Sequence, residues 1–179
     1  MRDKYQMLGN YHWREYCSNS LYQKHVNKVI GFFKNKKGKL LDIGCGDGLI
    51  LSKLTENKNL HCFGIDISPT AISIARAKGV SNCVVIDLFM LTKVDRYDYI
   101  FLGDVLEHLS DCEKALTKVK EHLDKVILIT IPLQERKNMF DYHLFTKESA
   151  LDLVNNIFDV VSCEEEYSKI YIVGEHKNG

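Results

Sequence analysis

The sequence has few of the features that divide a chain into separate parts. It contains only two prolines, Pro69 and Pro132, and no stretch rich in proline, glycine and serine that would form a linker. No internal repeat is present. Lysine plus arginine and aspartate plus glutamate number 24 each, so the formal net charge is zero and gives no support to nucleic-acid binding. These absences favour a single domain spanning residues 1–179.

Signals for membranes and disulfides are also missing. No apolar run is long enough to span a bilayer, and the polar first ten residues do not resemble a signal peptide. The six cysteines are scattered without a Cys-x-x-Cys pair, which argues against a disulfide framework or a zinc ribbon. We therefore expect a cytoplasmic protein with no membrane span.

Predicted strands and helices alternate along most of the chain. Residues 3–35 carry an apolar stripe at helical spacing and predict a helix. Helices are further predicted at 49–56, 69–78, 112–123 and 147–154, with Ser68, Asp111 and Thr146 as caps. Short apolar runs predict strands at residues 40–43, 62–65, 82–86, 97–102, 126–131, 158–164 and 169–173. This alternation predicts an α/β fold with a parallel, doubly wound sheet.

The most informative stretch is residues 40–49, Leu-Leu-Asp-Ile-Gly-Cys-Gly-Asp-Gly-Leu. Three glycines at alternate positions allow a tight turn and close approach to a ligand. A dinucleotide-binding turn would have glycine where Leu49 stands, and a phosphate-binding P-loop would have Gly-Lys-Ser/Thr. Asp42, two residues before the first glycine, would repel a pyrophosphate but suits a positively charged ligand.

This pattern resembles motif I of the class I S-adenosylmethionine (SAM) methyltransferases. Residues 63–68, 84–88, 97–104 and 126–132 resemble the second to fifth strands of that family, in order and at family spacing. The resemblance implies a Rossmann-like, doubly wound mixed sheet of seven strands with helices on both faces. The last strand is expected to be antiparallel and inserted between the fifth and sixth. Residues 1–36 would form a helical lid or extension, and residues 37–179 the core.

The resemblance also implies SAM as the cofactor. Asp42 would orient its methionine end, Asp66 would accept from both ribose hydroxyls, and Asp87 would accept from the adenine amino group with the Leu88 amide nearby. A strand-terminal aspartate is also a common helix cap or turn former, so this alternative stays open. The full expected cofactor set is Asp42, Gly44, Cys45, Gly46, Asp66, Ile67, Asp87, Leu88, Gly103 and Asp104.

A second cluster of acids and histidines follows the fourth predicted strand. Asp104, Glu107 and His108 would share one face if their segment is helical, and His143 comes later at the same end of the sheet. Ubiquinone-pathway O-methyltransferases carry a similar acid-x-x-Glu-His segment, and small-RNA 3′-end 2′-O-methyltransferases use matching positions as metal ligands. Catalytic roles for His143, His108 and Glu107, a divalent metal held by the four side chains, and simple packing remain open. A metal is the alternative that we do not expect.

The N-terminal segment is rich in aromatic residues. Tyr11, Trp13 and Tyr16 are candidates for lining a substrate pocket beneath a lid, and the alternative is an aromatic helix packed on the sheet edge.

The combined prediction is a SAM-dependent methyltransferase acting on an oxygen of a small-molecule acceptor, with nitrogen left open. The alternatives are a metal-assisted 2′-O-methyltransferase of RNA 3′ ends and a non-catalytic SAM-binding regulatory domain. We expect a small molecule and no nucleic acid as the partner, in a monomer or a homodimer.

Overall fold

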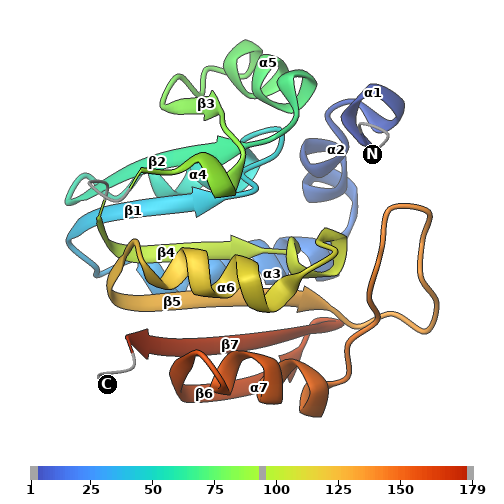
Figure 1. Ribbon diagram of the computed structural model, residues 1–179. Coiled ribbons are helices and arrows are strands. Elements are labelled where there is room, and N and C mark those ends of the chain that lie inside the picture. The colour runs from blue at the N-terminus through green and yellow to red at the C-terminus, as the bar shows by residue number, and fades with distance from the viewer. Residues whose placement is uncertain (1–3, 93–95, 177–179) are drawn as a thin grey trace.

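The computed structural model describes residues 4–92 and 96–176, which form one mixed sheet with helices on both sides (Figure 1). The strand order is β3-β2-β1-β4-β5-β7-β6. In chain order the strands are β1 (Gly38–Ile43), β2 (Leu60–Asp66), β3 (Cys83–Val85), β4 (Tyr97–Gly103), β5 (Leu123–Pro132), β6 (Phe158–Glu166) and β7 (Lys169–His176).

The direction of the last strand matches the sequence-based prediction. Strands β1 to β5 pair in parallel. Strand β7 is antiparallel to both of its neighbours, β5 and β6, and lies between them. The seven-stranded Rossmann-like sheet with an inserted antiparallel strand is therefore confirmed.

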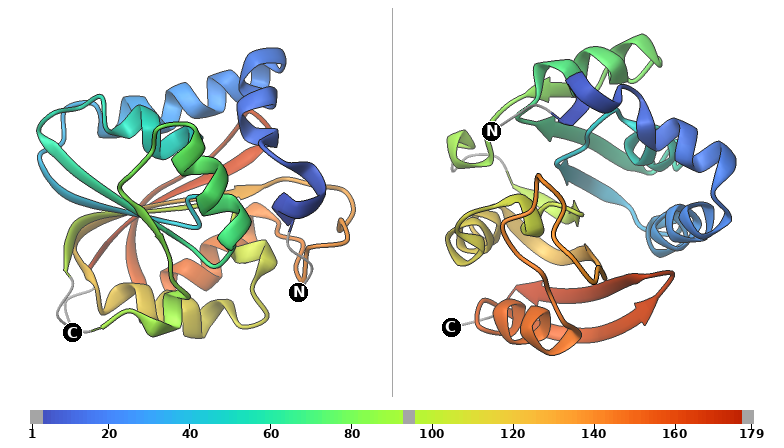
Figure 2. Two further views of the ribbon diagram at one scale, coloured as in Figure 1. Left: turned by 90° about the horizontal axis from the view of Figure 1, so that it is seen from above. Right: turned by 90° about the vertical axis from the view of Figure 1, so that its right-hand side faces the viewer.

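Two layers of helices cover the sheet, as the two views of Figure 2 show. One face packs against α3 (Ser20–Phe33), α4 (Leu49–Leu54) and α5 (Pro69–Ala77). The other packs against α6 (Cys112–Lys120), α7 (Lys147–Asn155) and the short 3-10 helices η1 (Leu88–Met90) and η2 (Leu106–His108). Successive strand residues serve opposite faces. In β1, for example, Leu40 belongs to the first core and Leu41 to the second.

The three predicted helix caps are present. Ser68 Oγ accepts from the Ala71 amide at 3.0 Å, and Pro69 occupies the first helical position, where no amide donor is needed. The Asp111 carboxylate and the Thr146 hydroxyl likewise accept amides at the starts of α6 and α7. These local contacts explain why the starts of these helices are readable from sequence.

The single helix predicted over residues 3–35 is wrong, because the described part of this segment contains three helices. They are α1 (Lys4–Leu8), α2 (Tyr11–Ser18) and α3. Gly9 adopts a left-handed φ of 61°, which ends α1. The Asn19 side chain accepts the Leu21 and Tyr22 amides, which caps α3 and separates it from α2. A continuous apolar stripe did not reveal these breaks.

The carboxyl ends of the central parallel strands point toward the side where α1, α2 and the loop of residues 133–146 lie (Figure 1). In open α/β sheets, ligands bind at this end of the strands. Within the described ranges, no helix has both the length and the apolar character needed to cross a membrane.

Candidate cofactor and acceptor site

The glycine loop after β1 has a backbone that only glycine adopts without strain. Gly44, Gly46 and Gly48 have φ values of 74°, 56° and 79°. The Gly44 amide donates to the carbonyl of Ile65 at 2.8 Å, which ties the loop to β2. A Cβ at position 44 would lie 2.4 Å from Val105 Cγ2. The loop therefore combines a tight turn with a close approach to the segment after β4.

Asp66, at the end of β2, is held in place by the glycine loop. Its Oδ2 accepts from the Gly46 amide at 2.9 Å and its Oδ1 from the Ser68 amide at 2.8 Å. Each carboxylate oxygen has two acceptor lone pairs, so these bonds position the group without excluding further donors. The side chain of Ile67 beside it is 67% exposed, which presents an apolar surface at the same end.

Asp87 and Leu88 lie one strand further along. The Asp87 Oδ1 accepts from the Phe89 amide at 3.0 Å, so this carboxylate caps η1. The Leu88 side chain is buried in the core. The capping alternative is thus realised at Asp87, and its expected contact with adenine stays a prediction.

Asp42 lies beneath the loop as a buried carboxyl group. Its side chain is 2% exposed, and its Oδ2 has no hydrogen-bond partner among the described residues. Burial, with a smaller contribution from the nearby Asp66 carboxylate, raises the pKa of Asp42 to about 8. A buried acceptor without a donor fits a cationic group such as the methionine ammonium of SAM.

Asp104, directly after β4, forms an ion pair across the sheet. It has a left-handed φ of 54°, and its carboxylate pairs with the Lys169 ammonium and accepts from Thr130 Oγ1. Although burial opposes ionisation, the Lys169 charge and these hydrogen bonds hold the pKa of Asp104 at about 2. The carboxylate is therefore ionised and already engaged by a cation.

The shared helical face expected for Asp104, Glu107 and His108 does not form. The segment is a 3-10 helix of only three residues, and Asp104 lies outside it in the left-handed region. Instead, His108 lies between two carboxyl groups. Its Nδ1 is 3.0 Å from Asp141 Oδ1, and its Nε2 is 3.8 Å from Glu107 Oε1.

Burial changes the protonation of this group of side chains. Glu107 is 3% exposed, and burial, followed by the Asp104 charge, raises its pKa to about 8. Burial also lowers the pKa of His108, with the Lys4 ammonium adding to the effect. At neutral pH the favoured state therefore has a protonated Glu107 and a neutral His108, which is the form of histidine that accepts a proton.

His143 approaches the same group through its backbone. Its amide and that of Tyr142 donate to the Glu107 carbonyl at 3.2 and 2.7 Å, and its buried Nε2 has no hydrogen-bond partner within residues 4–92 and 96–176. In the part of the chain that the structure describes, no three His, Cys, Asp or Glu side chains are arranged to hold a metal ion. The four suggested metal ligands are thus not assembled as a metal site, and Asp104 is engaged by Lys169.

Helices α1 and α2 lie over this end of the sheet. The Tyr5 hydroxyl lies against Gly46, since a Cβ at position 46 would be 2.0 Å from it. The Lys4 ammonium is 4.9 Å from the centre of the Tyr11 ring. Burial lowers the pKa of Lys4, against the opposing charges of Asp104, Glu107 and Asp141. The first helix therefore reaches both the glycine loop and the group formed by the side chains of Asp104, Glu107, His108, Asp141 and His143, which we call the acid-histidine group.

The three aromatic residues expected to line a substrate pocket lie in different places. The Tyr11 ring packs 5.7 Å from that of Tyr5, near the acids. Trp13 Nε1 donates to the Asp47 carbonyl at 2.8 Å, on the glycine loop. The Tyr16 ring lies 5.9 Å from the Lys53 ammonium on α4. Only Tyr11 approaches the acid-histidine group through these contacts.

Sequence reasoning assigned no role to several residues that this site contains. Asp47 stood inside the glycine motif, and Tyr5 and His12 stood in the aromatic segment, but spacing did not indicate that they meet. Asp141 is two residues from His143 in sequence, which was an available signal. Lys169 lies 65 residues from its partner Asp104 and gave none. The residues missed are Lys4, Tyr5, His12, Asp47, Asp141 and Lys169.

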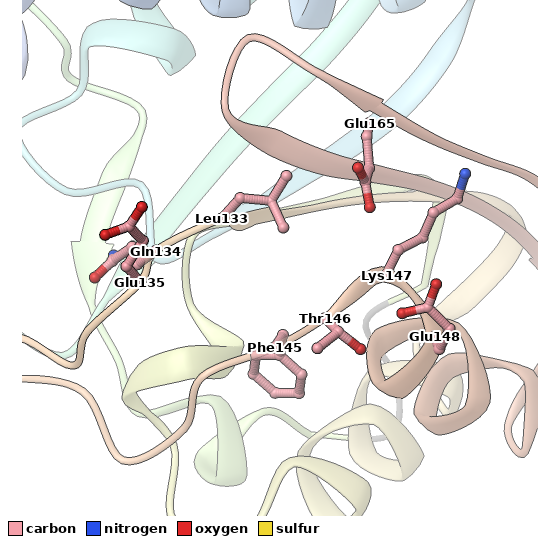
Figure 3. Close-up of a pocket in the computed structure, with 8 residues that line it drawn as sticks. All are labelled: Leu133, Gln134, Glu135, Phe145, Thr146, Lys147, Glu148 and Glu165. Carbon is pink, nitrogen blue, oxygen red and sulfur yellow. The ribbon is translucent and has the colours of Figure 1, made fainter.

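A pocket of about 350 Å³ lies beside this group, between the loop after β5, the start of α7 and the end of β6 (Figure 3). Figure 3 shows Leu133 and Phe145 toward its middle, with Gln134 and Glu135 on one side and Lys147 and Glu165 on the other. None of the expected cofactor residues lines it. The pocket adjoins the acid-histidine group because the Phe145 ring packs 5.8 Å from that of His143.

The family model and the curated relatives that match this chain are all methyltransferases. A family model described as a methyltransferase domain matches residues 12–164. A ubiquinone biosynthesis O-methyltransferase from Hahella chejuensis is 31% identical over 80 residues, covering 41% of this chain and 33% of that protein. Phosphoethanolamine N-methyltransferase 2 from Caenorhabditis elegans is 25% identical over 127 residues, covering 65% and 29%. Each alignment thus spans about a third of the curated relative's length.

Solved structures share the fold at low sequence identity. A chain from the complex between the Haloferax volcanii Trm112 methyltransferase activator and a methyltransferase superposes with a TM-score of 0.82, at 14% identity over 99% of this chain and 100% of that one. The N-methyltransferase NodS from Bradyrhizobium japonicum, in complex with S-adenosylhomocysteine (SAH), gives 0.75 at 17% identity, covering 97% and 98%. Magnesium protoporphyrin IX methyltransferase from Synechocystis, with SAH, gives 0.77 at 17% identity and 98% coverage of both chains.

Proposed function

Since this chain belongs to the class I SAM-dependent methyltransferases, we propose that it transfers the methyl group of SAM to an oxygen of a small-molecule acceptor. The observation that carries the choice of oxygen is the position of His108 between Asp141 and Glu107 at the ligand end of the sheet. A hydroxyl acceptor must lose a proton during transfer, whereas a neutral amine attacks with its lone pair. A half-buried, neutral histidine supplies the base that a hydroxyl needs.

The residues of the glycine loop fit the cofactor. The buried Asp42 acceptor suits the ammonium of the methionine part, Asp66 suits the ribose hydroxyls, and the exposed Ile67 suits one face of the adenine. Asp87 would accept from the adenine amino group. Bound there, SAM supplies a methyl group on a positively charged sulfur.

His108 acts as the general base in this proposal. The Asp141 carboxylate lies 3.0 Å from Nδ1 without the alignment of a hydrogen bond, and in this proposal its negative charge favours a proton on that nitrogen and leaves Nε2 to accept. Glu107 is protonated at neutral pH and does not compete for the proton of the acceptor. As the acceptor oxygen takes the methyl group, its proton passes to Nε2. His143, whose amide bonds to the Glu107 carbonyl, keeps the loop in position.

The pocket beside His143 is the proposed location for the rest of the acceptor. Its apolar side chains, Leu133 and Phe145, suit a hydrocarbon or aromatic body, and its polar rim suits hydroxyl groups. The named relatives include both O- and N-methyltransferases, so the accepting atom has to be measured. One neighbour is a complex with an activator, and assays should therefore include possible dependence on a partner protein. The cytoplasmic location and the monomeric or dimeric state stay predictions.

The test compares His108→Ala with His61→Ala, an exposed histidine at the opposite end of β2. SAH release would be measured with a panel of catechols, other phenols and primary amines, and SAH affinity by calorimetry. We expect turnover of a phenolic acceptor, a loss of about 10²–10⁴-fold in kcat for His108→Ala, and unchanged SAH affinity. His61→Ala should behave as the parent protein.

Each other outcome selects an alternative. Turnover of amines alone would replace oxygen with nitrogen as the accepting atom. Full activity of His108→Ala would remove the proposed base and leave orientation as the source of the rate. Loss of activity with a chelator and recovery with Mg²⁺ or Mn²⁺ would favour metal-assisted transfer to RNA ends. Tight SAH binding with no turnover of any acceptor would favour a regulatory SAM-binding domain.

A further inference from the structure

Helices α1 and α2 differ from α3 in how they are held against the rest of the protein. No residue of either helix is fully buried, although Lys4, Tyr5, Tyr11, His12 and Trp13 are half-buried, whereas α3 fully buries His25, Val26, Val29 and Phe33. Most tertiary stability of a surface helix comes from packing an apolar face, and this pair packs only half-buried side chains. Specific contacts with the glycine loop should therefore contribute a large share of the stability of its position.

Three of those contacts converge on Asp47. Its side chain is fully buried, and its Oδ2 accepts from the His12 amide at 3.1 Å. Its Oδ1 lies 3.1 Å from His12 Nδ1, and its carbonyl accepts from Trp13 Nε1 at 2.8 Å. The Asp47 carboxylate thus contacts the backbone and the ring of His12, and the Asp47 carbonyl accepts from the indole of Trp13.

The bond to the His12 amide replaces a missing helix cap. Asn10, the residue preceding α2, makes no side-chain capping bond, so the first amides of the helix need another acceptor. Asp47 provides one from 35 residues away in sequence. Its negative charge also lies at the positive end of the α2 dipole. Helix α2 is therefore capped by the glycine loop and not by its own sequence.

Asp47 stands between Gly46 and Gly48, so the contact joins the lid directly to the backbone that meets the cofactor. In α1, the Tyr5 hydroxyl lies against Gly46 on the same loop. The loop and the lid are therefore joined at neighbouring residues, and Asp47 supplies the side-chain acceptor of that junction.

We propose that Asp47 is a positioning residue: it docks a lid, formed by α1 and α2, on the cofactor loop, so that lid docking and cofactor binding stabilise each other. The proposal rests on the proposed function only in that SAM binds along this loop. Because coupling between two equilibria is reciprocal, the factor by which bound cofactor favours the docked lid is the factor by which the docked lid strengthens cofactor binding, so weakening the lid contact should weaken cofactor binding. A lid whose side chains are at most half-buried has little packing to hold it, so loss of these bonds should have a large effect on its docking.

The single tryptophan of the chain makes this measurable without any turnover. Trp13 is the only indole and donates directly to the Asp47 carbonyl, so its fluorescence reports lid docking. The experiment uses the full-length protein with Asp47→Ala, His12→Ala and the double variant. His61→Ala, on the opposite end of the sheet, is the matched control. Iodide quenching of Trp13 and calorimetric SAH affinity are measured for each.

We expect both single variants to show increased iodide quenching and about tenfold weaker SAH binding, which is the effect of losing a charge-assisted hydrogen bond. The double variant should be no worse than Asp47→Ala alone, because His12→Ala removes only the ring contact, and Asp47→Ala removes that contact together with the bond from the His12 amide. His61→Ala should match the parent protein in both measurements. If Asp47→Ala does not fold, His12→Ala still tests the contact, since it leaves the loop sequence intact.

The opposite results would overturn the proposal. Unchanged quenching in the variants would mean that Asp47 does not hold the lid. Increased quenching with unchanged or tighter SAH binding would mean that the lid is uncoupled from the cofactor or obstructs it. Additive losses in the double variant would assign Asp47 a separate role within the loop. Failure of the parent protein to bind SAH would refute the cofactor assignment. The quenching measurement would then test only whether Asp47 holds the lid.

Discussion

Three carboxyl groups at the ligand end of the sheet show how neighbouring residues set protonation. Asp104 has a cation and a hydroxyl within reach, and its pKa is about 2. Asp42 and Glu107 are buried without such partners, and their pKa values rise to about 8. An aspartate is thus ionised at one strand end and neutral at another. Burial raises the pKa of a carboxyl group unless a nearby cation stabilises the ionised form.

Asp42 should make the stability of the ligand-free protein depend on pH. Its pKa is raised from 3.8 to about 8 on folding, so the folded state holds a proton that the unfolded state releases. Its contribution to stability is therefore complete below pH 3.8 and is lost as the pH rises through about 8. Asp42→Asn removes this titration, so the variant should gain stability relative to the parent between pH 5 and pH 8, on the order of 3 kcal/mol.

Urea unfolding at several pH values measures this difference. The comparison is between the two proteins at each pH, because Glu107 contributes a similar decline to both. A constant difference from pH 5 to pH 8 would show that Asp42 is ionised in the folded state.

At the scale of elements, the N-terminal helices divide by how they are held. Helix α3 contributes Val29 and Phe33 to the core on one face of the sheet. Helices α1 and α2 contain no fully buried residue and bind the glycine loop through Asp47. The division of the chain into a lid of residues 1–36 and a core of residues 37–179 stays a prediction, and these contacts favour a lid that ends before α3.

Removing residues 1–18 should therefore leave the sheet folded and weaken cofactor binding by tenfold or more. Circular dichroism should keep its cooperative thermal transition, and calorimetry should show the reduced SAH affinity. Removal of residues 1–33 is the matched control, since it also deletes Val26, Val29 and Phe33, each contributing roughly 1.5–3 kcal/mol by burial. That protein should lose its cooperative transition. Full SAH affinity after removal of residues 1–18 would show that α1 and α2 only pack on the surface.

At the scale of the whole molecule, the parallel strands bring residues distant in sequence to one edge. Asp42, Asp66 and Asp104 lie at the carboxyl ends of three different strands, which are adjacent because β1 lies between β2 and β4 in the sheet. A ligand bound at this edge contacts several elements at once, so its binding should stabilise the fold as a unit.

SAH at 100 times its dissociation constant should raise the thermal midpoint by roughly 5–10 °C, corresponding to about 2.7 kcal/mol. Asp66→Ala should abolish most of this increase, because the ribose hydroxyls lose their buried acceptor. Asp159→Ala, an exposed aspartate on β6, is the control and should retain the full increase. An equal increase in all three proteins, measured by scanning calorimetry, would reject Asp66 as a cofactor residue.

The amino-acid sequence by itself determined the alternation of strands and helices from residue 38 onward, three capped helix starts and the family. These features depend on local patterns: apolar runs, Ser68, Asp111 and Thr146 at helix starts, and glycines with a left-handed backbone. The inserted antiparallel strand was also foreseen, although through resemblance and not through periodicity.

Only the tertiary structure decided which side chains meet at the site. The pairing of Asp104 with Lys169, of His108 with Asp141 and of His12 with Asp47 joins segments that are 65, 33 and 35 residues apart. Nothing in local spacing encodes such contacts, because they depend on how loops from separate strands converge. The segment after β4 shows the same limit of sequence reasoning. The spacing of its side chains was compatible with an α-helix, but residues 106–108 form a 3-10 helix. Folding thus brings His108 next to Asp141 and the lid next to the glycine loop, although these segments are far apart in the sequence.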